Sequence, residues 1–124
     1  MNIEKVAKSS KTVAIITSND KVITDFQSSL DLIMTAKYET ETNLIAIDKN
    51  AIVDEFFVLS SGLAGEILQK FINYQAKIAI WGDFSKYTSK PLKDFIYESN
   101  KGNDIFFVAT KDDAVDCLVR TVKW

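Results

Sequence analysis

The chain has 124 residues, and its 47% hydrophobic and 26% charged residues are typical of a globular protein. The 15 Lys and Arg residues against 17 Asp and Glu give a net charge of −2, without a basic cluster, which argues against nucleic-acid binding. There is no histidine, so histidine bases, Ser-His-Asp triads and most zinc or non-haem iron sites are excluded.

The length and the single cysteine limit the kind of protein further. A chain of this size is expected to form one domain, spanning residues 1–124. No apolar run approaches the ~20 residues that cross a bilayer, and the N-terminal residues MNIEKVAKSSK lack a signal-peptide core. Cys117 has no partner for an intramolecular disulfide and is read as a small buried hydrophobe. We therefore expect a cytoplasmic protein without membrane contact.

The first third of the chain predicts two strands and a helix. Asn2–Ala7 is a candidate edge strand, and Thr12–Thr17 (TVAIIT) reads as a buried strand. Ser18 or Asn19 is expected to cap the helix that follows. Its apolar stripe is expected at positions four residues apart, namely Val22, Phe26, Leu30 and Met34. The polar segment 38–43 (YETETN) then closes the helix.

The middle of the chain repeats this order of elements. Leu44–Ile47 is a second core strand, and Asp54–Val58 (DEFFV) is compatible with an extra turn. A helix is expected from about Gly62 to Tyr74, with its apolar stripe at Leu63, Ile67, Phe71 and Tyr74. Lys77–Trp81 (KIAIW) is the next strand, and it leads into the loop GDFSKYTS.

The last third contains two further helices and a strand. Ser89 is expected to cap a helix that carries Pro91 in its first turn and ends at Gly102 in a left-handed conformation. Asp104–Ala109 (DIFFVA) is a strand. Thr110 opens the last helix, which runs to about Val122, in a capping box completed by an Asp at position 113.

Strands without alternating polarity, each followed by a helix, indicate a parallel sheet covered by helices. The predicted fold class is therefore α/β, with a single, mostly parallel sheet of four to five strands and about four helices.

A site in such a sheet is expected at the carboxyl ends of the strands. Asp48 and Asp83 directly follow central strands, and Lys86 and Tyr87 lie in the loop after the second of them. These four residues form a candidate ligand edge, although Asp at such positions also serves as a turn or capping residue. No glycine-rich phosphate loop occurs, and we expect no cofactor and no metal.

The stretch VLSSGLAGEILQKF raises a different possibility. Its order of strand, connector, Ser-Ser-Gly-Leu and helix resembles the STAS family, which includes the bacterial anti-sigma-factor antagonists. In that family the motif Asp-Ser-Ser-Gly-Leu-Gly opens a helix, and a partner kinase phosphorylates a serine. The resemblance implies a STAS-like architecture with Ser61 as the phosphoacceptor. Leu59 replaces the motif's Asp, and the connector before Ser60 is longer than usual.

The sequence is also similar to an uncharacterised bacterial family of small stand-alone proteins. The blocks that carry this resemblance are GLAGEILQKF (62–71) and GDFSKYTSKPLKDFIYESNKGNDIFF (82–107). That resemblance implies a fold and a bacterial source, without an activity or a catalytic residue.

Three interpretations of function follow. The first is a non-enzymatic regulatory module that binds a protein partner through the surface around Ser60, Ser61, Gly62 and Gly65 and through the GDFSKYTS loop. Phosphorylation of Ser61 is a secondary part of this interpretation. Capping and close packing are the structural explanation of the same four residues. The second is a small-molecule-binding or enzymatic domain that uses the candidate ligand edge. The third is a self-associating protein anchored by Trp81, Trp124 or the aromatic residues of DEFF.

Overall fold

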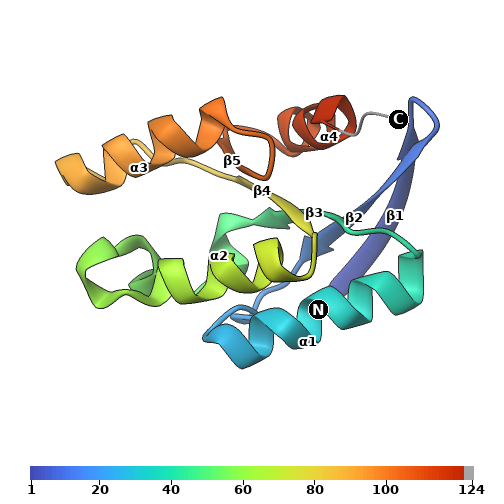
Figure 1. The fold of residues 1–124 in the computed structure, drawn as a ribbon, viewed down its shortest axis with the longest axis horizontal. Coiled ribbons are helices and arrows are strands. Elements are labelled where there is room, and N and C mark those ends of the chain that lie inside the picture. The colour runs from blue at the N-terminus through green and yellow to red at the C-terminus, as the bar shows by residue number, and fades with distance from the viewer. Residues whose placement is uncertain (122–124) are drawn as a thin grey trace.

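In the computed structural model, which describes residues 1–121, five strands form one sheet and four α-helices pack around it (Figure 1). The strands are β1 (Asn2–Lys8), β2 (Lys11–Thr17), β3 (Leu44–Asp48), β4 (Lys77–Trp81) and β5 (Ile105–Val108). The helices are α1 (Phe26–Thr40), α2 (Leu63–Asn73), α3 (Lys90–Lys101) and α4 (Lys111–Thr121).

The sheet has the order β1-β2-β3-β4-β5. β1 pairs antiparallel with β2, and every other neighbouring pair is parallel, which confirms the predicted α/β class and the edge strand. The hairpin between β1 and β2 turns through Ser9 and Ser10, whose φ angles of 54° and 65° are those of a type I′ turn.

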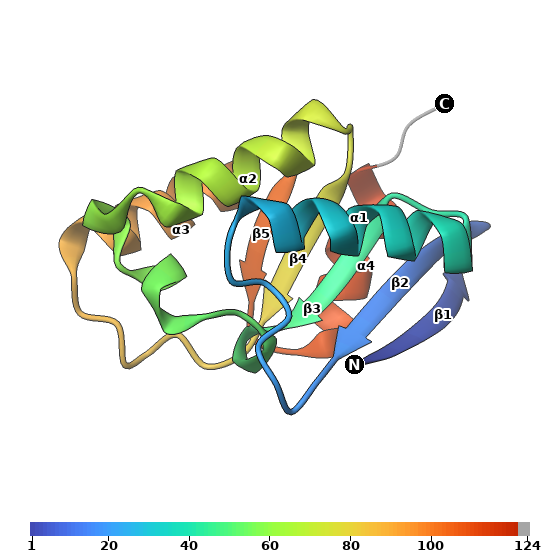
Figure 2. The ribbon, with the colours of Figure 1, turned by 90° about the horizontal axis from the view of Figure 1, so that it is seen from below.

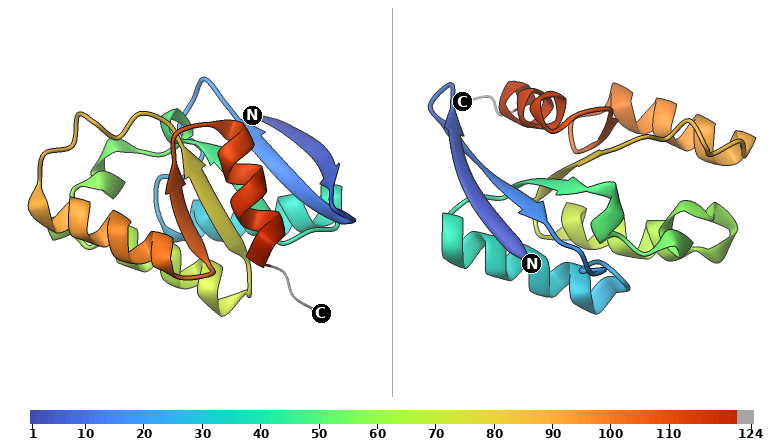
Figure 3. Two further views of the ribbon diagram at one scale, coloured as in Figure 1. Left: turned by 90° about the horizontal axis from the view of Figure 1, so that it is seen from above. Right: turned by 180° about the vertical axis from the view of Figure 1, so that it is seen from behind.

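Helices cover both faces of the sheet (Figures 2 and 3). α1 and α2 pack beside each other on one face, over a core that includes Ile45, Ile78 and Phe71. α4 packs on the other face over Ala46 and Ala79. Cys117 is buried on this helix, as predicted.

α3 lies along β5 and protects that edge of the sheet. The Asn100 side chain accepts the Phe107 N–H at 2.8 Å and donates to the Phe107 carbonyl oxygen at 3.1 Å, as a neighbouring strand would. Ser89 caps α3 as predicted, since its hydroxyl accepts the Leu92 N–H. Gly102 has a φ of −87°, so the predicted left-handed conformation at the end of α3 is wrong.

The first predicted helix begins later and faces the core differently. Its N-cap is Asp25, whose carboxylate accepts the Ser28 N–H at 2.8 Å, so the prediction of Ser18 or Asn19 as cap is wrong. Ile23 instead pairs with Ile52 in an isolated parallel bridge, which keeps the chain extended up to the cap.

The predicted apolar stripe of α1 is also wrong, because Phe26 and Met34 are 47% and 43% exposed. The helix buries another face, formed by Ser29, Leu32, Ile33, Ala36 and Thr40. The two buried hydroxyls donate to carbonyl oxygens four residues earlier, so burying that face leaves neither of them unpaired.

The connector between β3 and α2 folds into three short 3₁₀ helices, η1 (Lys49–Ala51), η2 (Asp54–Phe57) and η3 (Leu59–Ser61). The predicted extra turn at DEFF is thus present. In α2, Ile67 and Phe71 are buried as expected, but Tyr74 is 44% exposed because the helix ends at Asn73.

The last helix starts as predicted, since the Thr110 hydroxyl accepts the Asp113 N–H at 3.1 Å. Its predicted end at Val122 lies outside the described residues.

Candidate functional site

The serines of the Ser-Ser-Gly-Leu stretch are exposed at the start of α2. The Ser61 hydroxyl accepts the N–H of Leu63, the first residue of the helix, at 3.2 Å and donates to the Glu55 carbonyl oxygen at 3.1 Å. Ser61 therefore contributes to capping, although the N-cap position itself is occupied by Gly62. Ser60 and Ser61 are both accessible to a partner.

The two glycines of this stretch differ in what the fold requires of them. Gly62 has a φ of +79°, a left-handed conformation that suits glycine. Gly65 lies within α2, and a Cβ atom built on it would meet nothing within 4 Å. The same is true of Gly62, so the close packing given as the structural explanation of these two glycines is wrong within residues 1–121. Gly62 serves the backbone turn, whereas no packing within residues 1–121 explains Gly65.

The segment before Ser60 packs against the GDFSKYTS loop. The rings of Phe57 and Tyr87 stack with centroids 5.0 Å apart, and the Lys49 ammonium lies 5.1 Å from the Tyr87 centroid. Partial burial raises the pKa of Tyr87 above its ordinary value of 10.0, with a smaller contribution from the charge of Asp54. The structure thus brings the Gly82–Ser89 loop beside the connector that leads to Ser60 and Ser61.

The two aspartates of the candidate ligand edge hold turns. The Asp48 carboxylate accepts the Asn50 N–H at 2.8 Å and so caps η1. The Asp83 carboxylate accepts the Ser85 N–H at 2.9 Å. Hydrogen bonds from the Ser85 side chain and backbone lower the pKa of Asp83 below 3.8, and the nearby Lys49 and Lys86 lower it further. Both carboxylates are engaged in the turn chemistry that the sequence also allowed.

The candidate ligand edge does not converge on one cavity. Asp48 lines a hollow beside Thr17 and Asn19, while Tyr87 lines a different one with Phe84 and Ile96. Lys86 is exposed and lines neither. Within residues 1–121 no three His, Cys, Asp or Glu side chains gather closely enough to hold a metal ion.

The aromatic residues that suggested self-association are mostly in the core. Phe56 and Phe57 of the DEFF turn are buried, so their expected role as exposed anchors is wrong. Trp81 is half-buried and packs against the core beneath α4. Trp124 lies outside the described residues.

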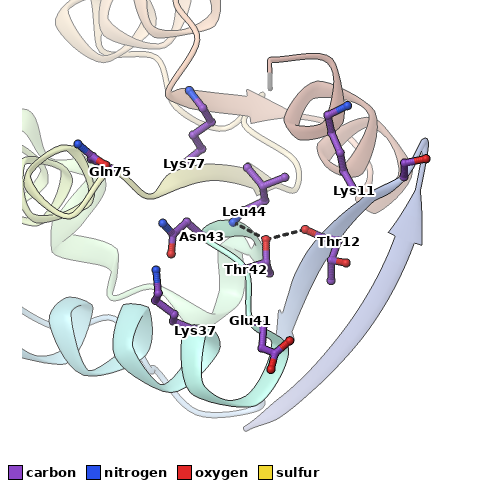
Figure 4. Close-up of a pocket in the computed structure, with 10 residues that line it drawn as sticks. Lys11, Thr12, Lys37, Glu41, Thr42, Asn43, Leu44, Gln75 and Lys77 are labelled. Atoms are coloured by element: carbon purple, nitrogen blue, oxygen red, sulfur yellow. Dashed lines mark hydrogen bonds between the residues drawn. The ribbon is translucent and has the colours of Figure 1, made fainter. Parts of the chain in front are cut away.

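Sequence reasoning missed a hollow of about 430 Å³ at the opposite, amino end of the parallel strands (Figure 4). Lys11 and Lys77, at the starts of β2 and β4, line it together with Asn43, just before β3, and with Lys37 of α1. The Thr42 hydroxyl on its wall donates to the Thr12 carbonyl oxygen at 2.7 Å. The one sign of this hollow in the sequence was that Lys11 and Lys77 stand at the starts of strands. Such a pattern is weak evidence as long as the fold is unknown.

Comparisons with known proteins give a family but no activity. Within residues 1–121 no helix has the length and apolar character needed to cross a membrane. No curated protein and no solved structure matches the chain. The profile of a family described as "Domain of unknown function (DUF4180)" matches residues 8–118, which is most of the chain. The chain therefore belongs to this family of domains of unknown function.

Proposed function

We propose that this protein is a non-enzymatic regulatory module that binds a protein partner through the surface formed by Ser60–Gly65 and the Gly82–Ser89 loop. Phosphorylation of Ser61 would switch this binding. The module would act in the cytoplasm of a bacterium, which suits its single buried cysteine.

The observation that carries the proposal is Gly65. A glycine inside a helix costs about 0.5–1 kcal/mol relative to alanine, because it loses more backbone freedom on folding. Gly65 is exposed, and a Cβ atom there would contact nothing within residues 1–121. The fold would be more stable with alanine, so a surface that must approach the α2 backbone closely is the better explanation of this glycine.

Ser61 supports a switch on the same surface. It is exposed, and its hydroxyl lies next to the first N–H groups of α2. A phosphate would add roughly 1.5–2 negative charges beside a helix N-terminus that favours anions. Glu55 and Glu66 lie close in sequence, so the modified surface would be strongly acidic and would bind a different set of partner residues.

The order of elements supports a STAS-like architecture for the module. An antiparallel edge strand, parallel strands in sequential order and a Ser-Ser-Gly-Leu stretch at a helix start occur together in the described chain. The DUF4180 profile also covers this stretch. The similarity of this architecture to the STAS family is therefore part of the proposal.

The test is affinity capture from a lysate of the source organism with tagged wild type, Gly65→Arg and Gln27→Arg. Gln27 is an exposed helical position on α1, so its variant adds the same charge elsewhere on the surface. We expect a stoichiometric partner with wild type and Gln27→Arg that is lost with Gly65→Arg. Equal recovery with all three proteins would contradict the proposed surface.

Phosphorylation has its own readout. Intact-mass measurement of protein recovered from the source organism should show the increment of one phosphate in wild type and Ser60→Ala, and none in Ser61→Ala. Unmodified wild-type protein under every growth condition would remove the switch from the proposal and leave the docking surface.

A further inference from the structure

The two edges of the sheet are protected to different degrees. α3 lies along β5, where the Asn100 side chain exchanges two hydrogen bonds with Phe107 in the manner of a further strand. β1 is the outermost strand on the opposite side (Figure 2), and β2 is its one strand neighbour within residues 1–121. An uncovered edge strand presents N–H and C=O groups that can pair with another chain. β1 is seven residues long, so this open edge is extensive.

The β1–β2 hairpin determines which backbone groups of β1 point outward. Lys8 and Lys11 close a two-residue type I′ turn, so they form a hydrogen-bonded pair. Hydrogen-bonded pairs alternate along an antiparallel ladder, so the even-numbered residues of β1 bond to β2 and the odd-numbered ones face outward. Within residues 1–121 no other backbone group bonds to the outward N–H and C=O groups of Ile3, Lys5 and Ala7.

The side chains on one face of β1 carry opposite charges. Lys8 pairs with Asp116 of α4. Glu4 is exposed, lies opposite the apolar Ile15, and makes no salt bridge within residues 1–121. Side chains alternate along a strand, so Glu4 and Lys8 share their face with Val6, which lies halfway between them. In an antiparallel copy of β1 the order of these two charges is reversed.

One register of self-pairing suits these side chains. With a twofold axis at Val6, Glu4 of each copy lies opposite Lys8 of the other. Lys5 then lies opposite Ala7, and their outward backbone groups bond to each other. An axis at Glu4 or at Lys5 would place two like charges directly opposite, which is destabilising. An axis at Ala7 would place Glu4 opposite the turn and leave its charge unpaired.

We propose that two copies of this chain join through their β1 strands, with the axis at Val6, into one continuous sheet. The occupant of the open edge is a second copy, because the charges of β1 complement those of β1 itself. The joined segment is short, so the dimer should be reversible and should form between micromolar and millimolar concentration. This edge lies on the opposite side of the molecule from the start of α2, so the dimer leaves the proposed docking surface free (Figure 2).

The test is the solution mass of the full chain, measured by analytical ultracentrifugation at low salt from micromolar to millimolar concentration. We expect the mass to rise from that of one chain toward that of two and no further, because a twofold dimer is closed. Glu4→Lys should weaken the association about tenfold or more, because it places lysines opposite each other twice. Glu98→Lys, the same exposed change on α3 at the other edge, should leave it unchanged.

The register has a readout of its own. In a Cys117→Ala background, Val6→Cys introduces the one thiol of the chain and places it at the axis. Opposite residues of a non-hydrogen-bonded pair are close enough for a disulfide. We expect Val6→Cys to give a linked dimer on mild oxidation. Asn2→Cys in the same background should stay unlinked, because its two copies lie at opposite ends of the joined strands.

Three results would each overturn the proposal. The first is a wild-type chain that stays monomeric up to millimolar concentration, which would give the lysines of β1 the protective role that edge lysines often have. The second is equal association of Glu4→Lys and Glu98→Lys. The third is Asn2→Cys forming the linked dimer as readily as Val6→Cys.

Discussion

The two ends of the parallel sheet use their polar side chains in opposite ways. At the carboxyl end, Asp48 and Asp83 accept backbone N–H groups of their own turns, and Tyr87 stacks on Phe57. At the amino end, Lys37 has no carboxylate partner within residues 1–121, and other polar residues occupy left-handed backbone. The polar residues at the carboxyl end stabilise the fold. At the amino end Thr42 and Lys77 do so as well, through a hydrogen bond and an ion pair, whereas Glu41 and Gln75 occupy left-handed backbone at a cost to it.

The start of α2 resembles the amino end in this respect. Gly65 weakens an exposed helical turn, and nothing within residues 1–121 packs against it. Where a more stabilising residue would fit without a clash, the residue that is present serves something other than stability. Such a position marks a candidate binding surface. Gly65 meets this criterion, whereas Asp48 and Asp83, which first suggested a ligand edge, satisfy local hydrogen bonds.

The largest effect is expected from the aromatic stack at the carboxyl end. Phe57→Ala should lower the free energy of unfolding by about 3–5 kcal/mol, because it removes a buried ring and leaves a cavity beneath Tyr87. Urea unfolding followed by circular dichroism measures this loss. The neighbouring Val58→Ala is the control, since Val58 is 54% exposed and should change little. Similar values for both variants would mean that Phe57 does not anchor this loop.

A smaller loss is expected at Asp48. Asp48→Ala removes the side-chain cap of η1 and should cost about 1 kcal/mol of unfolding free energy. Asp20→Ala, at an exposed loop position, is the matched control in the same urea experiment. If Asp48→Ala proves as stable as the control, its carboxylate is not serving the fold, and the contrast between the two ends of the sheet is broken.

The smallest effect is the acid dependence from Asp83. Its hydrogen bonds with Ser85 hold the pKa of the folded state below 3.8. The stability contributed by this group is therefore full above that value and is lost as the pH falls through the lower pKa of the folded state. We expect the unfolding free energy of wild type to fall more steeply below about pH 4 than that of Asp83→Asn. Identical pH profiles would contradict the turn role of Asp83.

The four parallel strands were predictable from the sequence because each contains a short apolar run that is buried on both faces of the sheet, unlike the mostly exposed edge strand β1. Ile45 and Ile78, for example, have no exposed surface and neighbour each other in register. α1 was harder, because tertiary structure decides where it begins. The bridge between Ile23 and Ile52 extends the chain up to Asp25, and the helix then buries a stripe that includes Ser29 and Thr40. A prediction that uses apolar residues alone therefore chose the side of α1 that carries the exposed Phe26 and Met34.

The two candidate sites also differ in whether the sequence alone could predict them. Ser61 was found because a local motif placed it at a helix start, and the structure exposes it there. The amino-end hollow was missed because its residues come from segments far apart in the chain. Its strongest mark, left-handed backbone at Glu41 and Gln75, is a property of backbone geometry that residue types do not reveal when glycine is absent.

The most direct test is the unfolding free energy of Gln75→Gly and Gly65→Ala, measured in urea beside Gly62→Ala. We predict that the first two variants are each about 0.5–1 kcal/mol more stable than wild type, because one relieves left-handed backbone and the other improves a helix. Gly62→Ala should be less stable, because its φ of +79° is strained for alanine. If Gln75→Gly and Gly65→Ala are no more stable than wild type, both residues serve the fold, and the argument that Gly65 is kept for a docking surface is contradicted.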